Sequence, residues 1–377
     1  MATLRGEPVD RPAVNFYEIG GFQVDPEDPD PFNIYNSPDW KPLLQLAEER
    51  SDLIRMRNPV RARSHDSWQM SSSADSDEFF ETQSFLENGC RMSRTTVTIG
   101  GRTLTSLTKR EPGIDTVWTV EHLLKDLDDL KAYLQIPDTA FLEQFDVTPL
   151  IEEEKELGDA GVIMVDTEDP LAAAATLFDL ETYTILAWSE QRWFHRLLEK
   201  CATYLHARTR KLARDFPGRL WRVCGPEYAV EPFLPTSLFR EYVVRYTGPM
   251  IRMIQEHGGY ARLHVHGRLK NVLDDIASMG VDAIDPIEPP PQGDVELEYV
   301  RQKYGKDIAL FGNLEIADLE NQPPERFEAI ARKSLEDGTK GEGRGFVLMP
   351  SASPYGRTIS ANTLKNYEML VNLVEAF

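Results

Sequence analysis

The sequence predicts an α/β protein that forms a single (β/α)8 barrel of the TIM type with an elaborated N-terminal half. From residue 219 onward, short apolar segments alternate with amphipathic ones. This is the pattern of parallel strands joined by right-handed helical crossovers. Five such units leave two architectures, a doubly wound sheet and a barrel. No strand is followed by G-x-G-x-x-G, and the chain has no Walker A motif, so the barrel is favoured.

The elements can be placed in chain order. Apolar runs predict strands at 13–19 and 162–166, and the insertion between them includes a β-hairpin at 95–108 that turns at Gly100-Gly101. The regular part predicts strands at 219–224, 260–265, 283–287, 308–312 and 345–349, with helices near 237–257, 268–279, 294–304, 324–337 and 361–376. We therefore expect one domain over 1–377, with an irregular portion of loops and a hairpin at 1–110 and five strand-helix units at 219–377.

Composition and charge narrow the class of protein. The chain has 377 residues, of which 41% are hydrophobic, and 41 basic against 62 acidic residues give a net charge of −21. Such a charge repels nucleic acids and anionic membranes. The longest apolar run, at 171–178, is too short to cross a membrane, and the polar N-terminus has no secretory signal. We expect a cytoplasmic enzyme for a small molecule, a monomer or homodimer, with no nucleic-acid or membrane partner.

Polar residues follow nearly every predicted strand, and in a barrel these strand ends form the active site. Each of these groups has a second reading, as an ion-pair partner or as a loop hydrogen-bonding group. The catalytic candidates are Glu227, Asp166, Tyr17 and Glu18, and the substrate-binding candidates are Tyr228, Asn313, Glu315, Ser351 and Ser353.

The segment His264-Val265-His266 is the sharpest local feature. Residues two apart on a strand share a face, so the two imidazoles can ligate one metal ion. Glu288, at the end of the next predicted strand, is the expected third ligand, with Cys224 as an alternative. Imidazole and carboxylate ligands suit Zn²⁺ or Fe²⁺. Without a metal, one histidine would be a hydrogen-bonded core group and the other would bind substrate.

Several segments carry a family resemblance. HVHGRLKNVLDDIASMGVDAIDPIEPPPQGDV, YGKDIALFGNLE and GRGFVLMPSASPYG, together with RPAVNFYEIGG and TVWTVEHLLKDLDDLKAYLQIP, resemble the uroporphyrinogen decarboxylase superfamily. The superfamily includes the lyases of haem biosynthesis and the cobalamin-dependent methyltransferases, and it implies a (β/α)8 barrel. The decarboxylases carry an arginine-rich segment after the first strand, where this chain has NFYEIGGFQ with Glu18. The resemblance therefore favours the methyltransferase-like branch.

Within that branch, the thiol-methylating enzymes bind zinc through His-x-Cys and a later Cys. This chain has His264-x-His266 and no cysteine in the later segment 350–353. The expected reaction is metal-assisted transfer of a methyl group from a small methoxy or methylamine substrate to a corrinoid on a separate protein. Two alternatives stay open, a metal-free decarboxylase of a small or tetrapyrrole carboxylate, and a non-catalytic barrel that binds a tetrapyrrole or corrinoid. A decarboxylase needs basic groups at the mouth, for which the candidates are Arg262, Arg268 and Arg357.

Overall fold

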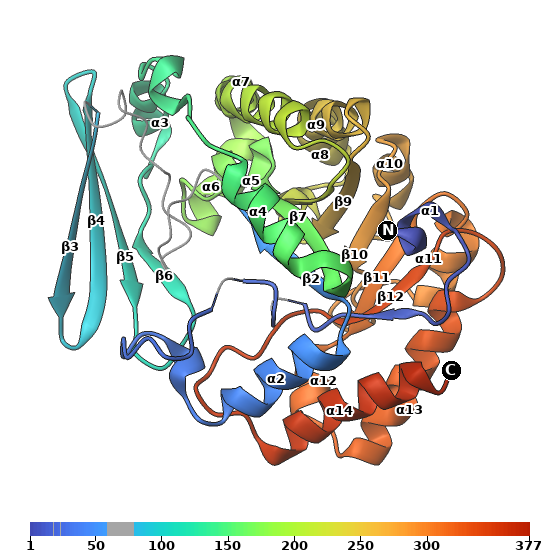
Figure 1. Cartoon of the computed structure of the whole chain (residues 1–377). Coiled ribbons are helices and arrows are strands. Elements are labelled where there is room, and N and C mark those ends of the chain that lie inside the picture. The colour runs from blue at the N-terminus through green and yellow to red at the C-terminus, as the bar shows by residue number, and fades with distance from the viewer. Residues whose placement is uncertain (18, 23, 59–78) are drawn as a thin grey trace.

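The computed structural model describes residues 1–17, 19–22, 24–58 and 79–377. An eight-stranded parallel sheet curls into a barrel, and a four-stranded antiparallel sheet stands beside it (Figure 1). The barrel strands are β1 (Ala13–Val14), β2 (Leu53–Arg57), β7 (Gly161–Glu168), β8 (Leu220–Cys224), β9 (Tyr260–Val265), β10 (Ala283–Pro286), β11 (Ala309–Leu314) and β12 (Phe346–Pro350). Their spatial order follows their order in the chain, so the structure confirms the predicted TIM-type architecture.

The two ends of the parallel sheet meet at a seam between β1 and β2. The backbone N–H of Asp52 donates to the carbonyl of Val14 at 2.7 Å, and that of Met56 donates to the carbonyl of Gly21 at 2.8 Å. β2 was not among the predicted strands. Its sequence, LIRMR, places arginines at alternate positions, so it lacks the continuous apolar run that identifies the other buried strands.

Helices cover the outside of the barrel (Figure 1). The helices before β8 are α1 (Ala2–Arg5), α2 (Trp40–Arg50), α3 (Leu127–Tyr133), α4 (Thr148–Leu157), α5 (Pro170–Ala175), α6 (Leu180–Ser189) and α7 (Gln191–Asp215). Those after β8 are α8 (Ser237–Phe239), α9 (Arg245–Glu256), α10 (Leu273–Ser278), α11 (Leu297–Tyr304), α12 (Ile316–Asn321), α13 (Pro324–Thr339) and α14 (Ala361–Glu375). A π-helical turn, Arg240–Val244, joins α8 to α9. Short 3-10 turns lie at Ile34–Asn36, Asp138–Phe141, Gly158–Ala160 and Pro226–Ala229.

The antiparallel sheet consists of β3 (Phe80–Glu87), β4 (Cys90–Ile99), β5 (Arg102–Arg110) and β6 (Val117–Glu121). The predicted hairpin is confirmed as β4 and β5, and Gly100 and Gly101 turn it with φ angles of 59° and 76°. That left-handed conformation suits glycine. Thus part of the N-terminal portion expected to be irregular is regular sheet. Most of β3 is exposed on both faces, so its sequence shows no alternation of apolar and polar residues.

Two apolar clusters hold the barrel together. The larger lies between the sheet and the surrounding helices, and the smaller fills the lumen. The lumen cluster consists of Leu4, Tyr17, Ile54, Met56, Met164, Leu220, Ala283, Ala309, Phe311, Val347 and Met349. Helix α1 is tied to the chain just before β12, because the backbone N–H of Gly345 donates to the carbonyl of Thr3 at 3.0 Å. The lumen is therefore a packed core at the end where α1 lies, and the polar side chains lie toward the opposite end.

None of the helices in the described ranges is long and apolar enough to span a membrane.

Candidate active site at the barrel mouth

The inward side chains change from apolar to polar along the barrel strands. On β8 the buried Leu220 is followed two residues later by Arg222, and on β10 Ala283 is followed by Asp285. Residues two apart lie on the same face of a strand. The carboxyl-terminal half of the lumen therefore carries charge above an apolar floor, at the end where barrel enzymes place their active sites.

Tyr17 and Asp166 meet through Arg222. The guanidinium donates to Asp166 Oδ1 at 2.8 Å and to the Tyr17 hydroxyl at 2.9 Å. The Tyr17 hydroxyl lies 3.5 Å from Nε2 of His264. Tyr17 has a φ of 57°, a left-handed conformation that is strained for a bulky residue. The structure therefore brings Tyr17 and Asp166, two of the predicted catalytic residues, together. Each of them is hydrogen-bonded to the buried Arg222.

Asp285 organises a second group of charges. It is 0% exposed and receives hydrogen bonds from Arg262 at 2.7 and 3.0 Å. Its Oδ2 also lies 2.7 Å from Nδ1 of His264. Burial alone would raise the pKa of Asp285, but Arg262 and His264 hold it well below its usual range.

His264 is neutral at the pH where most enzymes work. Burial and the nearby Arg222 lower the pKa of its imidazole to about 3. A neutral ring has one donor nitrogen and one acceptor nitrogen. Because Nδ1 faces the carboxylate of Asp285, it carries the proton, and Nε2 accepts from the Tyr17 hydroxyl. This histidine joins the two buried groups into one network across the barrel.

His266 forms a separate pair with Glu288. Its Nδ1 lies 2.7 Å from Glu288 Oε1, and Glu288 Oε2 accepts from the backbone N–H of Gly267 at 2.8 Å. Burial alone would lower the pKa of His266, but Glu288 and then Glu227 raise it above the usual value. Ile287, directly before Glu288, has a φ of 57°. Within the described residues, Nε2 of His266 has no hydrogen-bond partner, so it can donate to a substrate.

Two further carboxyl groups interact with His266 through charge. Glu227 follows β8 on a 3-10 turn, and its Oε2 accepts from the backbone N–H of Gly225 at 3.2 Å. Burial raises the pKa of Glu227. Glu315 follows β11, and burial together with the charge of Glu288 raises its pKa to about 7. The hydroxyl of Ser351 lies 3.4 Å from Glu315 Oε2 and also accepts from a backbone N–H.

The other predicted site residues are placed less centrally. The carboxamide of Asn313 accepts from Ser334, on the outer helix α13, at 2.8 Å, so this side chain does not reach the mouth as expected. Tyr228 is partly buried beside Tyr183, whose hydroxyl donates to the Tyr228 carbonyl at 2.6 Å. Ser353 lies partly buried on the loop after β12. Glu18 lies outside the described residues.

The predicted three-ligand metal site is not assembled in this conformation. Both ring nitrogens of His264 have protein partners, and both oxygens of Glu288 are occupied by His266 and a backbone N–H. Burial raises the pKa of the Cys224 thiol well above its usual value, which disfavours the thiolate that binds metals. In the described ranges, no group of three His, Cys, Asp or Glu side chains could hold a metal ion. The donor set does not fit the predicted zinc site.

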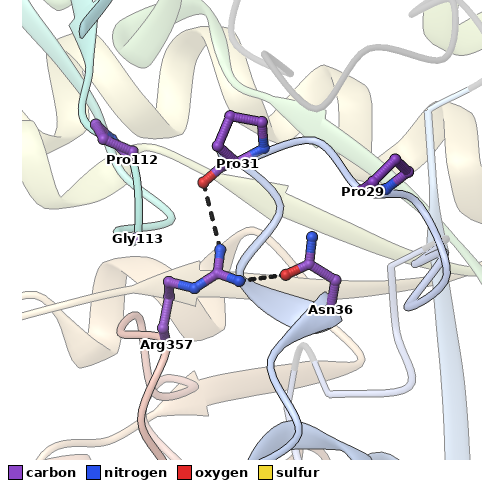
Figure 2. Close-up of a pocket in the computed structure, with 6 residues that line it drawn as sticks. All are labelled: Pro29, Pro31, Asn36, Pro112, Gly113 and Arg357. Carbon is purple, nitrogen blue, oxygen red and sulfur yellow. Dashed lines mark hydrogen bonds between the residues drawn. The ribbon is translucent and has the colours of Figure 1, made fainter. Parts of the chain in front are cut away.

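The basic residues expected to hold a carboxylate substrate are engaged elsewhere or exposed. Arg262 is bound by Asp285, and Arg268 is exposed after β9. Arg357 lines a cavity of about 450 Å³ with Pro29, Pro31, Asn36, Pro112 and Gly113. Figure 2 shows its guanidinium donating to the Pro31 carbonyl and the Asn36 side chain. Arg357 therefore joins the loop after β12 to the N-terminal loop.

Arg222 and Asp285 are central to the site, and neither was singled out from the sequence. The signal that could have identified them is a charged residue inside an otherwise apolar strand, in RLWRVC and AIDPI. Such a residue is expensive to bury unless it is paired. Their partners lie on other strands, so the pairing depends on the register of the barrel.

Comparisons with known proteins agree with this architecture. The sequence model of the family "Uroporphyrinogen decarboxylase (URO-D)" matches residues 113–377. A solved structure, a methyltransferase from Methanosarcina mazei, superposes with a TM-score of 0.58 at 16% identity, covering 100% of this chain and 97% of the other. At that identity the likeness concerns the fold. The search of curated proteins gave no match. Because the family match spans well over half of the sequence, the chain belongs to the uroporphyrinogen decarboxylase (URO-D) family.

Proposed function

We propose that the protein is a methyltransferase that removes a methyl group from a small methoxy or methylamine substrate and passes it to a corrinoid on a partner protein. The observation that carries this proposal is that the arginines at the mouth are already paired with carboxylates. Arg222 and Arg262 are each paired with a carboxylate of the protein itself. A polycarboxylate porphyrinogen would find little cationic attraction there. The methyltransferase among the structural neighbours adds support for this branch of the family.

His266 is the residue best placed to act on the leaving group. Glu288 holds its Nδ1, so the Nε2 proton can be directed at an ether oxygen that carries the methyl group, whereas a methylammonium nitrogen already carries such a proton. A protonated heteroatom keeps the electron pair of the broken carbon–heteroatom bond without becoming an anion, and such acid catalysis contributes about 10²- to 10⁴-fold in rate. The corrinoid would supply the nucleophile that accepts the methyl group.

The test is an anaerobic assay of the purified protein with cob(I)alamin and a panel of methoxy and methylamine compounds. The absorbance of cob(I)alamin reports the methyl transfer. We expect turnover by the wild type, a loss of at least about 100-fold with methoxy compounds in His266→Gln, and little change in His257→Gln. His257 lies just before the opposite end of β9 and serves as the matched control. Zinc analysis of the same samples tests metal assistance. About one zinc per chain that is lost in His266→Gln would show that the ligands rearrange around a metal.

Decarboxylation of a small carboxylate is the second candidate, and one observation favours it. The Nε of Arg222 is buried without a hydrogen-bond partner among the described residues. A small carboxylate that displaced Asp166 could use this donor. Release of CO₂ from such a compound, with no methyl transfer from any member of the panel, would favour the decarboxylase and overturn our proposal.

A further inference from the structure

At the barrel mouth, carboxyl groups outnumber the basic groups that pair with them. Asp166 is paired with Arg222, Asp285 with Arg262, and Glu288 with His266. Glu227 and Glu315 remain, and in the part of the chain that the structure describes neither forms an ion pair. An unpaired carboxylate is costly to bury, and proton uptake is the usual escape. Two carboxyl groups at the mouth therefore lack a cation.

Glu315 gives the stronger evidence that a ligand binds at the mouth. It directly follows β11 and is only 8% exposed. Oε2 has the hydroxyl of Ser351 at 3.4 Å, but Oε1 is buried and has no hydrogen-bond partner among the described residues. A buried polar atom without a partner is rare in a native protein and calls for an explanation such as a missing ligand. The charges of Glu288 and His266 both act on Glu315, and its position directly after β11 places it at the mouth end of the barrel.

Glu227 approaches the same place from β8. The charges of His266 and Glu227 act on each other. Backbone N–H groups, that of Gly225 at 3.2 Å from Oε2 and that of Glu227 itself, leave other acceptor positions of the carboxyl group for a ligand. Glu227 and Glu315 thus follow β8 and β11, the strands on either side of β9 and β10, at the same end of the barrel as His266, whose Nε2 has no hydrogen-bond partner among the described residues.

We propose that Glu227 and Glu315 bind the protonated nitrogen of a methylated amine, so that the methyl donor is an ammonium compound and not an ether. This inference rests on the proposed function for the identity of the reaction, but the binding site can be tested without it. A secondary ammonium group carries positive charge and two N–H donors, which match two carboxyl groups that lack a cation. An ether oxygen only accepts hydrogen bonds and brings no charge.

The proposal is tested with two probes that share one skeleton. 2-(Methylamino)ethanol is a cation at neutral pH, and 2-methoxyethanol is its neutral ether counterpart. Isothermal titration calorimetry with the full-length wild-type protein should give a Kd for the amine at least tenfold lower than for the ether. Glu315→Gln and Glu227→Gln should each raise the Kd of the amine about tenfold and leave that of the ether unchanged. Glu320→Gln removes a carboxylate from the outer helix α12, beside Tyr367, and should change neither value.

The outcomes separate this inference from the proposed function. Equal or tighter binding of the ether, or an amine preference that survives both substitutions, overturns the ammonium site. If the ether is then demethylated, the methyltransferase proposal stands without it. Preferential binding of the amine with no methyl transfer to cob(I)alamin supports the site and contradicts the proposed reaction. Should one variant fail to fold, the other variant together with the wild-type ratio still decides, because either carboxamide alone should weaken binding of the amine.

Discussion

Tyr17 is the residue on which the buried network converges. Its hydroxyl accepts a hydrogen bond from Arg222 and faces Nε2 of the neutral His264, so one oxygen connects the segment after β1 with β8 and β9. A left-handed conformation costs a residue other than glycine about 1–3 kcal/mol. The strain is tolerated because the side chain is buried and its hydroxyl is used twice. Tyr17 is thus better described as a residue that positions His264 than as a group that reacts.

Tyr17→Phe should destabilise the protein by about 1–3 kcal/mol, since it leaves an N–H of Arg222 and Nε2 of His264 buried without a partner. Urea unfolding measures this change. The matched control is Tyr355→Phe, which removes a hydroxyl from a side chain that is 61% exposed and should change the free energy of unfolding by less than about 0.5 kcal/mol. Equal stability of Tyr17→Phe and the wild type would show that the hydroxyl contributes nothing to the network.

The sequence could indicate which residues end the strands, but not which of them would meet. The pair of histidines on one face of β9 was predictable from the period of two, and the structure confirms that Val265 faces the outer core. The partners of the histidines could not be derived in the same way. Asp285 lies opposite His264 in the register of β9 and β10, and Glu288, which pairs with His266, follows Ile287 with its unusual φ.

At the scale of single elements, Asp169 ties two helices to the strand that precedes them. Its Oδ1 accepts from the backbone N–H of Ala172 at the start of α5, and its Oδ2 accepts from Thr247 on α9, both at 2.7 Å. Its own N–H donates to the carbonyl of Cys224. The carboxyl group is 0% exposed, and this burial raises its pKa to about 7.

This raised pKa predicts a loss of stability as the pH increases. The unfolded chain ionises Asp169 near its ordinary pKa, whereas the folded chain keeps the proton until about pH 7. The folded state therefore binds more protons over that range, and its stability falls with pH until the folded pKa is passed. Between pH 6 and 9 the wild type should lose about 1 kcal/mol more than Asp169→Asn, which cannot ionise and can still cap α5.

Asp179 provides a control of opposite sign. It caps α6, and hydrogen bonds from Thr182 lower its pKa. Its contribution is present above the unfolded pKa and disappears as the pH falls through the folded pKa. Asp179→Asn should therefore differ from the wild type at pH 6 and approach it in acid, as measured by urea unfolding. A pH dependence of Asp169→Asn identical to that of the wild type would contradict the assigned role of Asp169.

Element boundaries were predicted well where amphipathic periodicity alone decides them. Three predictions differ: the strand expected at 13–19 is only Ala13–Val14, the helix expected at 294–304 begins at Leu297, and the helix expected at 268–279 begins at Leu273 as α10. In the segment before α10, the backbone of Arg268 pairs with that of Glu231 in an isolated antiparallel β-bridge, and the backbone N–H of Lys270 donates to Asp294. Those groups take the hydrogen bonds that a helix would have needed. Contacts with distant loops of this kind leave no mark in the local sequence.

At the scale of the whole molecule, barrel closure depends on a seam between its shortest strand and a strand that the sequence did not reveal. Asp52 holds this seam with both its backbone and its side chain. Its N–H donates to the carbonyl of Val14, and its Oδ2 accepts from the N–H of Val14 at 2.8 Å and from Arg11 at 2.7 Å. Sequence periodicity predicts the eightfold architecture from its repeated units, but not the residue that closes the ring.

Asp52→Ala should therefore lower the free energy of unfolding by about 1–3 kcal/mol, because the buried N–H of Val14 loses its acceptor. The half-exposed ion pair with Arg11 adds at most about 1 kcal/mol. Asp52→Asn keeps an acceptor oxygen and should recover most of the loss, which separates the hydrogen bond from the charge. Asp159→Ala, at an exposed carboxylate before β7, is the control. Since Tyr17 follows Val14 by three residues, a loosened seam should also raise amide exchange around Tyr17. Full protection there in Asp52→Ala would show that the barrel closes without this residue.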